Sequence, residues 1–439
     1  MFWVIYMLLI IIIAIISIAG MFFCIFKFPT LKIGDITIDT FYLPPLIGAI
    51  IIFLLPSFDK NELFSICFSN SSLNPLKILV LFICISILSI ALDQTGFFSY
   101  IASIFINKYK ASQIKLFVVL YILISFLTIF TSNDIVILTF TPFILYFSKR
   151  GNINPIPYLV MEFVAANTYS MILPIGNPTN IYLTSIFEID FLAYVSKMIL
   201  PALLCGIISF ICVYLLFKKE LKKKISIFDM EISKINNKPL CIIAFIHLAL
   251  TTILLAISNY INIEMWIICF VFALSISIIL IVYSIVKHNS FYIMSTIKRV
   301  PYSLIPFILS MFTIIMALDS FNIFDYIYNC INNINIAYLQ KLTYLISSVL
   351  ACNIINNIPM TLAYGSILSN TNNLSFVYIT IIGSTIGAIL TPVGALAGIM
   401  WLRILKINAI NYSFKSFVKN GMIITFSIIL VLMLIIIII

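Results

Sequence analysis

The sequence predicts an all-α polytopic membrane protein made of two inverted-topology repeats, each with five spans, one re-entrant hairpin and one broken helix. Of its 439 residues, 63% are hydrophobic and only 9% are charged, and the mean hydropathy is +1.20. This composition is typical of membrane helices and leaves no segment for a soluble domain. The other two observations are a duplicated pattern of helix breaks and an uneven distribution of Lys and Arg among the loops.

Ten apolar runs predict the spans, five in each half of the chain. They lie at about 2–26, 41–56, 76–92, 156–188, 192–217, 240–257, 262–286, 301–318, 375–405 and 417–439. The fourth and ninth runs are interrupted by Pro and Gly, which predicts a broken helix in each half. The domain boundaries follow as a first repeat at 1–217, a Lys-rich cytoplasmic linker at 218–238 and a second repeat at 239–439.

Each half also contains a predicted re-entrant hairpin. The apolar runs 116–130 and 135–147 are shorter than the ~20 residues of a spanning helix, and a polar tip separates them. The second hairpin is expected at about 340–369. Segments 97–110 and 321–333 interleave aromatic with polar residues, which predicts helices lying along the two membrane interfaces.

Residue identities repeat between the halves as well as hydropathy. Ala91-Leu92-Asp93 recurs as Ala317-Leu318-Asp319, at an offset of 226 positions. The tip Asn133-Asp134-Ile135 corresponds to Asn356-Asn357-Ile358, and Pro174-Ile175-Gly176 corresponds to Pro392-Val393-Gly394. Three matches in the same order indicate an internal duplication. Five spans in a repeat is an odd number, so the second copy must be inverted.

The basic residues predict the orientation through the positive-inside rule. With both termini outside, 21 of the 25 Lys and Arg residues fall in cytoplasmic segments and four fall outside. We therefore expect a plasma-membrane protein with its N- and C-termini outside. The first hairpin then enters from the cytoplasm and the second from outside. The formal net charge of +10 follows from this topology, and no nucleic-acid partner is predicted.

The hairpin tips and the two breaks define one candidate substrate site. Breaks at membrane depth free carbonyl groups and create helix N-termini, and paired discontinuous helices mark the binding site of many transporters. The predicted substrate-binding residues are Ser132, Asn133, Asn177, Thr179, Asn180, Asn356, Asn357, Thr391 and Gly394.

Asp134 is the predicted coupling residue, for a proton or a cation. An acid within a membrane segment is a functional candidate by default. The alternative is that Asp134 only caps a helix, and the same alternative applies to the Asn residues of the tips and breaks. No cofactor or metal is predicted. The nine cysteines form no C-x-x-C pair and fit small buried residues. No enzyme motif is present.

Two motifs resemble the arsenical pump membrane protein family of the ion transporter superfamily. The first is Ser132-Asn133-Asp134 followed by Leu138 and Thr141-Pro142. The second runs from Leu390-Thr391-Pro392-Val393-Gly394 through Ala397 to Trp401-Leu402. The resemblance covers nearly the whole chain. Related divalent-anion symporters carry Ser-Asn-Thr at both tips, and this chain departs from that signature.

The resemblance implies a secondary transporter that exports arsenite, with antimonite as an alternative cargo, in exchange for protons. Asp134 would repel a dicarboxylate, and no Lys or Arg lies in the predicted core spans to pair with one. Neutral As(OH)3 fits better. The alternatives are a sodium/proton antiporter and a citrate or divalent-anion permease. The expected partners are a small inorganic solute, a coupling proton or sodium ion, and the lipid bilayer. A homodimer and a soluble ATPase partner stay open.

Overall fold

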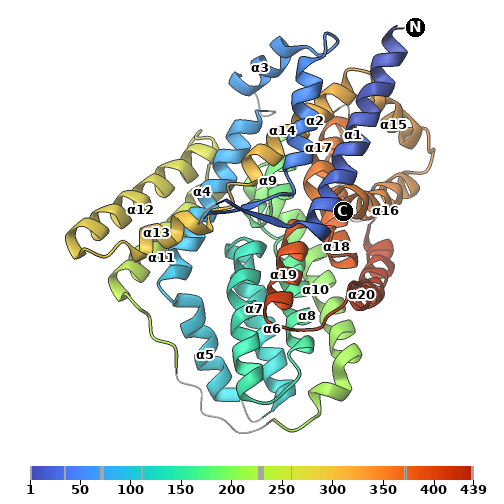
Figure 1. The fold of residues 1–439 in the computed structure, drawn as a ribbon. Helices are drawn as coiled ribbons and strands as arrows, with labels where there is room; N and C mark the ends of the chain where they lie inside the picture. Colours follow the sequence, from blue (N-terminus) through green and yellow to red (C-terminus); the bar gives the residue numbers. More distant parts are fainter. Residues whose placement is uncertain are drawn as a thin grey trace.

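The computed structural model describes residues 2–33, 36–69, 74–109, 112–225, 232–258, 260–369, 371 and 373–436. These residues form twenty α-helices, one short 3-10 helix and two β-strands (Figure 1). The structure is therefore helical, as predicted, apart from one small β-hairpin. In that hairpin β1 (Thr30–Ile33) pairs antiparallel with β2 (Ile36–Asp39).

Ten helices and the 3-10 helix η1 make up the first half of the chain. They are α1 (Phe2–Lys27), α2 (Leu43–Leu54), α3 (Lys60–Phe68), α4 (Pro75–Gln94), α5 (Phe97–Tyr109), α6 (Gln113–Phe130), α7 (Asn133–Arg150), α8 (Ile156–Tyr169), η1 (Pro174–Gly176), α9 (Pro178–Ile186) and α10 (Phe191–Leu221). Capping fixes several starts. For example, Asn74 accepts from the backbone N–H of Leu76, and Pro75 opens α4 with a preset φ.

The second half contains a further ten helices. They are α11 (Lys238–Ala256), α12 (Met265–Lys287), α13 (Phe291–Arg299), α14 (Leu304–Asp319), α15 (Ile323–Asn332), α16 (Ala337–Ile355), α17 (Asn357–Ile367), α18 (Leu374–Leu390), α19 (Leu396–Ile407) and α20 (Phe414–Ile435). Each predicted span and hairpin arm has a helix at its position. Both predicted interfacial segments are helical as well, as α5 and α15.

The arms of the first hairpin are longer than their apolar runs, 116–130 and 135–147, predict. Both α6 and α7 have 18 residues, because Gln113 and Lys115 at one end and Lys149 and Arg150 at the other continue the helices beyond the apolar runs. Three elements were not predicted: the β-hairpin, α3 and α13. The helix α10 also continues to Leu221, into the predicted linker, of which residues 226–231 lie outside the described part of the chain.

Eight helical segments of the described chain are long and apolar enough to cross a membrane. They are Trp3–Lys27, Pro75–Gln94, Gln113–Phe130, Phe191–Leu221, Lys238–Ala256, Met265–Lys287, Phe291–Asp319 and Phe414–Ile435. Two further apolar helices, Leu43–Leu54 and Leu374–Leu390, are shorter than these segments. The ten crossings stay a prediction, because length and composition do not say which helices cross.

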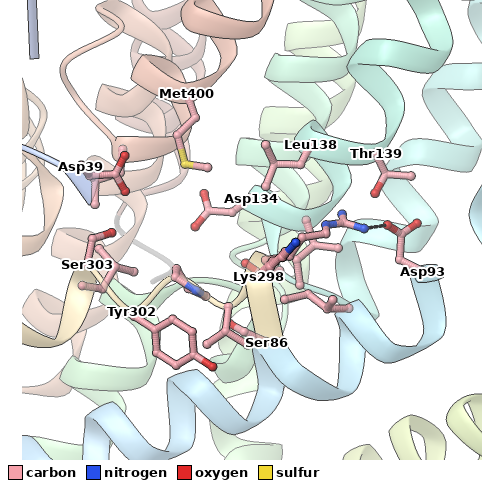
Figure 2. Close-up of a pocket in the computed structure, with 18 of the residues that line it drawn as sticks. Asp39, Ser86, Asp93, Asp134, Leu138, Thr139, Lys298, Tyr302, Ser303 and Met400 are labelled. Carbon is pink, nitrogen blue, oxygen red and sulfur yellow. Dashed lines mark hydrogen bonds and ion pairs between the residues drawn. The ribbon is translucent and has the colours of Figure 1, made fainter. Parts of the chain in front are cut away.

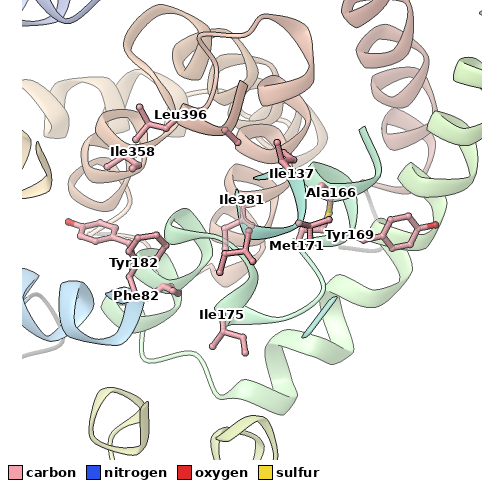
Figure 3. Close-up of a cluster of buried hydrophobic side chains, with 14 of the residues drawn as sticks. Phe82, Ile137, Ala166, Tyr169, Met171, Ile175, Tyr182, Ile358, Ile381 and Leu396 are labelled. Atoms are coloured by element: carbon pink, nitrogen blue, oxygen red, sulfur yellow. The ribbon is translucent and has the colours of Figure 1, made fainter. Parts of the chain in front are cut away.

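Burial divides the helices into central and peripheral ones. Every residue of α8 from Pro157 to Tyr169 is buried. By contrast, α12 exposes Val271, Ile278 and Ile285. Their spacing of seven residues places them in one stripe along one face of the helix. A helix that is buried on all sides belongs to a core, whereas an exposed apolar stripe is suited to lipid. Side chains from α4, α7, α8, α9, α17, α18 and α19 form the central apolar cluster (Figure 3).

Contacts between the halves place the hairpins against the broken helices. Here α7 of the first hairpin packs on α19, and α17 of the second hairpin packs on α9. Within each half, α8 lies between α6 and α10, and α18 lies between α16 and α20. Outside this centre, α4 packs on α11 and α12, and α14 packs on α1 and α2. The result is a set of discontinuous helices at the middle of the molecule (Figure 1).

Candidate functional site

The first hairpin turns through two residues, Thr131 and Ser132. The Thr131 hydroxyl donates to the Leu127 carbonyl at 2.8 Å, which closes the end of α6. The Ser132 carbonyl accepts from the N–H groups of Ile135 and Val136, both at 3.2 Å, so Ser132 starts α7 through its backbone. Its hydroxyl is buried and has no partner among the described residues. Asp134 therefore stands in the first turn of α7, where the helix dipole favours negative charge.

The second hairpin turns through a single residue, Asn356. Its backbone has φ +73° and ψ 155°, a region that residues with a side chain rarely adopt. The side chain compensates in part, because Nδ2 donates to the Val393 carbonyl at 2.9 Å and Oδ1 accepts from the Ile358 N–H at 3.3 Å. The adjacent Asn357 N–H donates to the Gly394 carbonyl at 3.1 Å. The second tip is thus joined to the second break.

Amide side chains hold the break between α8 and α9. Asn177 caps α9 by accepting from the Thr179 N–H and hydroxyl, both at 3.2 Å. Asn180 Nδ2 donates to the carbonyls of Ser170 and Leu173, at 2.9 and 3.2 Å. All three polar side chains are buried. Their hydrogen bonds satisfy backbone groups that the break would otherwise leave without partners.

The break between α18 and α19 uses a different set of groups. Thr391 donates to Asn353 Oδ1 at 2.6 Å, and Asn353 Nδ2 donates to the Gly387 carbonyl at 2.9 Å. A Cβ on Gly394 would lie 2.8 Å from that same Gly387 carbonyl oxygen. Glycine is therefore needed at 394 for the close approach of the two chain segments.

A cavity of about 950 Å³ opens beside the first tip (Figure 2). Its wall comes from the end of α1, the β-hairpin, α4, the start of α7, the segment from α13 to α14, and α19. Ser132 and Asp134 line it, and Figure 2 shows the Asp134 carboxylate directed into the open space. Asp134 is partly exposed there and has no hydrogen bond or ion pair to any described residue.

The structure does not bring the other predicted residues to this wall. Asn133 lies behind the tip, where its Nδ2 donates to Asn167 of α8 at 3.3 Å. The remaining seven occupy the two breaks and the second tip and do not line the cavity; they are Asn177, Thr179, Asn180, Asn356, Asn357, Thr391 and Gly394. Two buried amide oxygens, Oδ1 of Asn133 and Oδ1 of Asn357, have no partner among the described residues. These occupy the first position of α7 and of α17.

Basic residues that the sequence analysis counted only for topology also line the cavity. Arg299 forms an ion pair with Asp93 at 2.6 Å, and Arg403 lies 3.6 Å from Asp39. Lys298 is exposed on the same wall. No Lys or Arg was expected in the core spans to pair with an anion, yet three basic residues line the cavity. Lys298 and Arg299 end α13, outside the predicted spans, whereas Arg403 belongs to α19 within the predicted run 375–405. Tertiary packing brings all three residues to the cavity.

No group of three or more His, Cys, Asp or Glu residues in the described chain is arranged to hold a metal ion. The described groups at the tips and breaks are amides, hydroxyls, carbonyls and one carboxylate, which suit a small polar solute or an ion. Discontinuous helices occur in two matching places, and an acidic group enters a cavity beside the first tip. This combination is typical of a membrane transporter.

Comparison with known families agrees with this class. The sequence profile of the citrate transporter family (CitMHS) matches residues 3–377, and the chain belongs to this family. It is therefore a multi-pass membrane protein and a secondary transporter, not an enzyme.

Several relatives are named for arsenical transport. A Bacillus subtilis (strain 168) protein, provisionally named an arsenical pump membrane protein, is 25% identical over 367 residues, 77% of this chain and 82% of the relative. An arsenical pump membrane protein of Yersinia enterocolitica is 23% identical over 368 residues, 80% of this chain and 83% of the relative. An uncharacterized transporter of Methanocaldococcus jannaschii is 28% identical over 267 residues, 59% of this chain and 67% of the relative. The names of the first two relatives match the family that the motifs resemble.

Proposed function

We propose that this transporter exports arsenite from the cytoplasm in exchange for protons. The observation that carries the proposal is Asp134, a carboxylate without a partner among the described residues, directed into a large cavity at the start of α7. Its carboxylate can accept the hydroxyls of As(OH)3 or take up a proton, and protonation removes its charge and part of its acceptor capacity. Competition between cargo and proton at one group is the simplest basis for exchange.

The relatives support the choice of cargo. Those named arsenical pump membrane proteins match across about four-fifths of this chain. As(OH)3 is neutral near pH 7, so its transfer into a membrane protein avoids the cost of desolvating a charged cargo. Antimonite has the same hydroxyl chemistry and is expected to use the same acceptors.

The contact pattern supports two repeats of the same fold, divided by the linker at 218–238. If the second repeat matches the first, α11, α12 and α14 correspond to α1, α2 and α4. The contact of α4 with α12 then corresponds to the contact of α14 with α2. The contact of α7 on α19 pairs in the same way with that of α17 on α9. We propose that the second repeat is inverted, as its odd number of spans requires, and that hairpins and broken helices move together during transport.

Arsenite uptake into everted vesicles with an imposed proton gradient tests the function. We expect gradient-driven uptake by the intact protein and its loss in Asp134→Asn, because an amide can bind hydroxyls but cannot exchange a proton. Glu220→Gln is the matched control, since it removes an acidic charge from the end of α10. Uptake that is unchanged in Asp134→Asn would remove this residue from coupling. A sodium-driven collapse of the proton gradient without arsenite movement would identify a sodium/proton antiporter instead.

The basic residues of the cavity favour one second candidate, a carboxylate anion such as citrate. Lys298, Arg299 and Arg403 share the cavity wall with Asp134, and the family is described by citrate transport. Under this alternative, radiolabelled citrate would enter the same vesicles. Lys298→Gln would then reduce uptake of citrate and leave arsenite flux unchanged, because only the charged cargo requires a cation.

A further inference from the structure

A second acidic residue, Glu162, lies in the interior of the protein, away from the cavity. It is on α8 and has 0% of its surface exposed. The hydroxyl of Thr141, on α7, lies 3.0 Å from Oε1 and 3.1 Å from Oε2 of the same carboxyl group. Asp134 and Thr141 are seven residues apart on α7, so two helical turns separate the cavity acid from the partner of Glu162.

The third member of this cluster is Trp401 of α19. Its indole Nε1 is buried, interacts with the Glu162 carboxyl and does not reach hydrogen-bond geometry with any described group. The ring packs on Phe163, the residue after Glu162, with centroids 5.2 Å apart. Glu162 therefore has one donor in place and a second, unused donor beside it.

No charged side chain from the described helices around α8 faces this carboxyl. From α7 and α19 the facing groups are Thr141 and Trp401. The titratable groups of α6 and α10 near α8, Tyr121 and Cys205, interact with Tyr169 instead. Other ionisable groups nearby are engaged elsewhere: Tyr412 with Trp401 and Asn420, Tyr378 with Tyr194, and Arg403 with Asp39.

An ionised carboxylate in such a place costs several kcal/mol of desolvation, which one hydroxyl cannot offset. In the neutral state the carboxyl and the Thr141 hydroxyl can each donate to the other. In the ionised state the carboxylate can accept from both Thr141 and the free Trp401 N–H. The Trp401 N–H, which has no partner among the described residues, is thus available as the second donor that the ionised state needs.

We propose that Glu162 is a second proton-binding site of the transporter, occupied in this conformation, and that its proton controls how α7 and α19 are held together. These two helices supply much of the cavity wall and contact each other directly. Loss of the proton recruits the Trp401 N–H and draws α19 toward α7 and α8. This mechanism goes beyond the exchange at Asp134, and its link to transport rests on the proposed function.

Tryptophan emission tests the proton site without any substrate. The chain has three tryptophans, and Trp3→Phe with Trp266→Phe leaves Trp401 as the single reporter. Titration of this purified variant from acid to alkaline pH is expected to give one reversible step in emission, because the adjacent carboxyl changes charge. The step should disappear in Glu162→Gln and persist in Asp134→Asn. A step that survives in Glu162→Gln, or its absence in the parent variant, would overturn the proposal.

Two further measurements separate a proton site from a structural role. Thr141→Val removes the donor and keeps the shape of the side chain, so it should move the midpoint of the emission step without removing it. In everted vesicles, Glu162→Gln should flatten the dependence of arsenite flux on internal pH while the protein stays folded, as monitored by its thermal transition. Unchanged pH dependence in Glu162→Gln would show that Glu162 is only a neutral hydrogen-bonding residue. Failure of arsenite transport in the intact protein would leave the emission result standing.

Discussion

Asn356 combines a strained backbone with two stabilising side-chain hydrogen bonds, which makes its substitutions informative. Alanine and glycine both remove the bonds to Val393 and Ile358, but only glycine relieves the positive φ. Strain of this kind costs about 1–3 kcal/mol. We therefore expect Asn356→Gly to be more stable than Asn356→Ala by about that amount, measured as thermal unfolding of the purified protein in detergent. Equal stability of the two variants would show that the backbone relaxes without cost.

The Asp93–Arg299 pair links the two halves at the cavity wall. Only 7% of the Asp93 side chain is exposed, so removal of its partner leaves a largely buried charge. We expect Arg299→Gln and Asp93→Asn each to destabilise the fold by about 1–3 kcal/mol, and the double variant to cost less than their sum. Thermal unfolding of the four proteins measures the coupling. Strict additivity would mean that the pair contributes nothing in detergent.

The positions of the tips and breaks could be predicted from the sequence, but the hydrogen-bond partners of their side chains could not. Clusters of Asn, Pro and Gly within apolar runs predicted both breaks, although single residues such as Pro142 and Pro201 lie inside continuous helices. Whether an amide then faces a substrate or the broken backbone depends on distances that only packing fixes. Asn180 contacts two carbonyls of its own break, whereas Asp134, in an equally polar segment, faces a cavity. Their roles in substrate binding stay predictions.

At the scale of elements, α16 and α18 approach each other through Gly383 and Gly387, a G-x-x-x-G pattern. A Cβ on Gly387 would lie 2.3 Å from Cys352 Sγ and 2.9 Å from the Val349 carbonyl oxygen. Small residues at such spacing let helix backbones pack closely in membranes.

Gly387→Ala should therefore destabilise the protein by about 1–3 kcal/mol through overpacking. Adding Cys352→Ala removes the nearer obstacle and should restore part of that loss, whereas Ser427→Ala on the exposed α20 is a neutral control. Thermal unfolding in detergent reports all of these effects. A double variant no more stable than Gly387→Ala would place the conflict with the backbone of α16.

Helix positions were predictable because apolar runs and Pro or Gly breaks are local signals. Helix lengths were less so, since α6 and α7 continue through charged residues at the ends of their apolar runs. The β-hairpin of β1 and β2 was missed because each strand has only four residues. Its strand pairing depends on packing beside the cavity, where Ile38 and Asp39 contribute to the wall.

At the scale of the whole molecule, duplication and composition predicted the class of protein, and the cavity could not be predicted. Its wall joins segments separated by more than 300 residues, from Ile25 of α1 to Arg403 of α19. No local pattern records that proximity. In the sequence, membrane topology alone explains the basic residues. Only the fold shows that some of them also line the cavity.

The predicted orientation places the opening of the cavity on the cytoplasmic side. Lys298, Arg299 and Arg403 belong to segments that the positive-inside rule assigns to the cytoplasm, and all three line the cavity. On this predicted orientation, we propose that the cavity is open to the cytoplasm, which is the state that would receive a cargo for export. Labelling of single cysteines in a variant without the nine native cysteines tests this directly.

Met400 lines the cavity on α19, and Tyr260, 76% exposed, follows α11 on the side predicted to be external. A membrane-impermeant maleimide should label Met400→Cys in everted vesicles and Tyr260→Cys in right-side-out vesicles. Leu430→Cys, on the exposed apolar face of α20, should react slowly in both, because lipid covers it. Arsenite should slow the labelling of Met400→Cys if the cavity holds the cargo. Labelling of both positions from the opposite sides would show that the predicted topology is inverted. Protection by citrate and not by arsenite would identify citrate as the cargo and would not affect the predicted orientation.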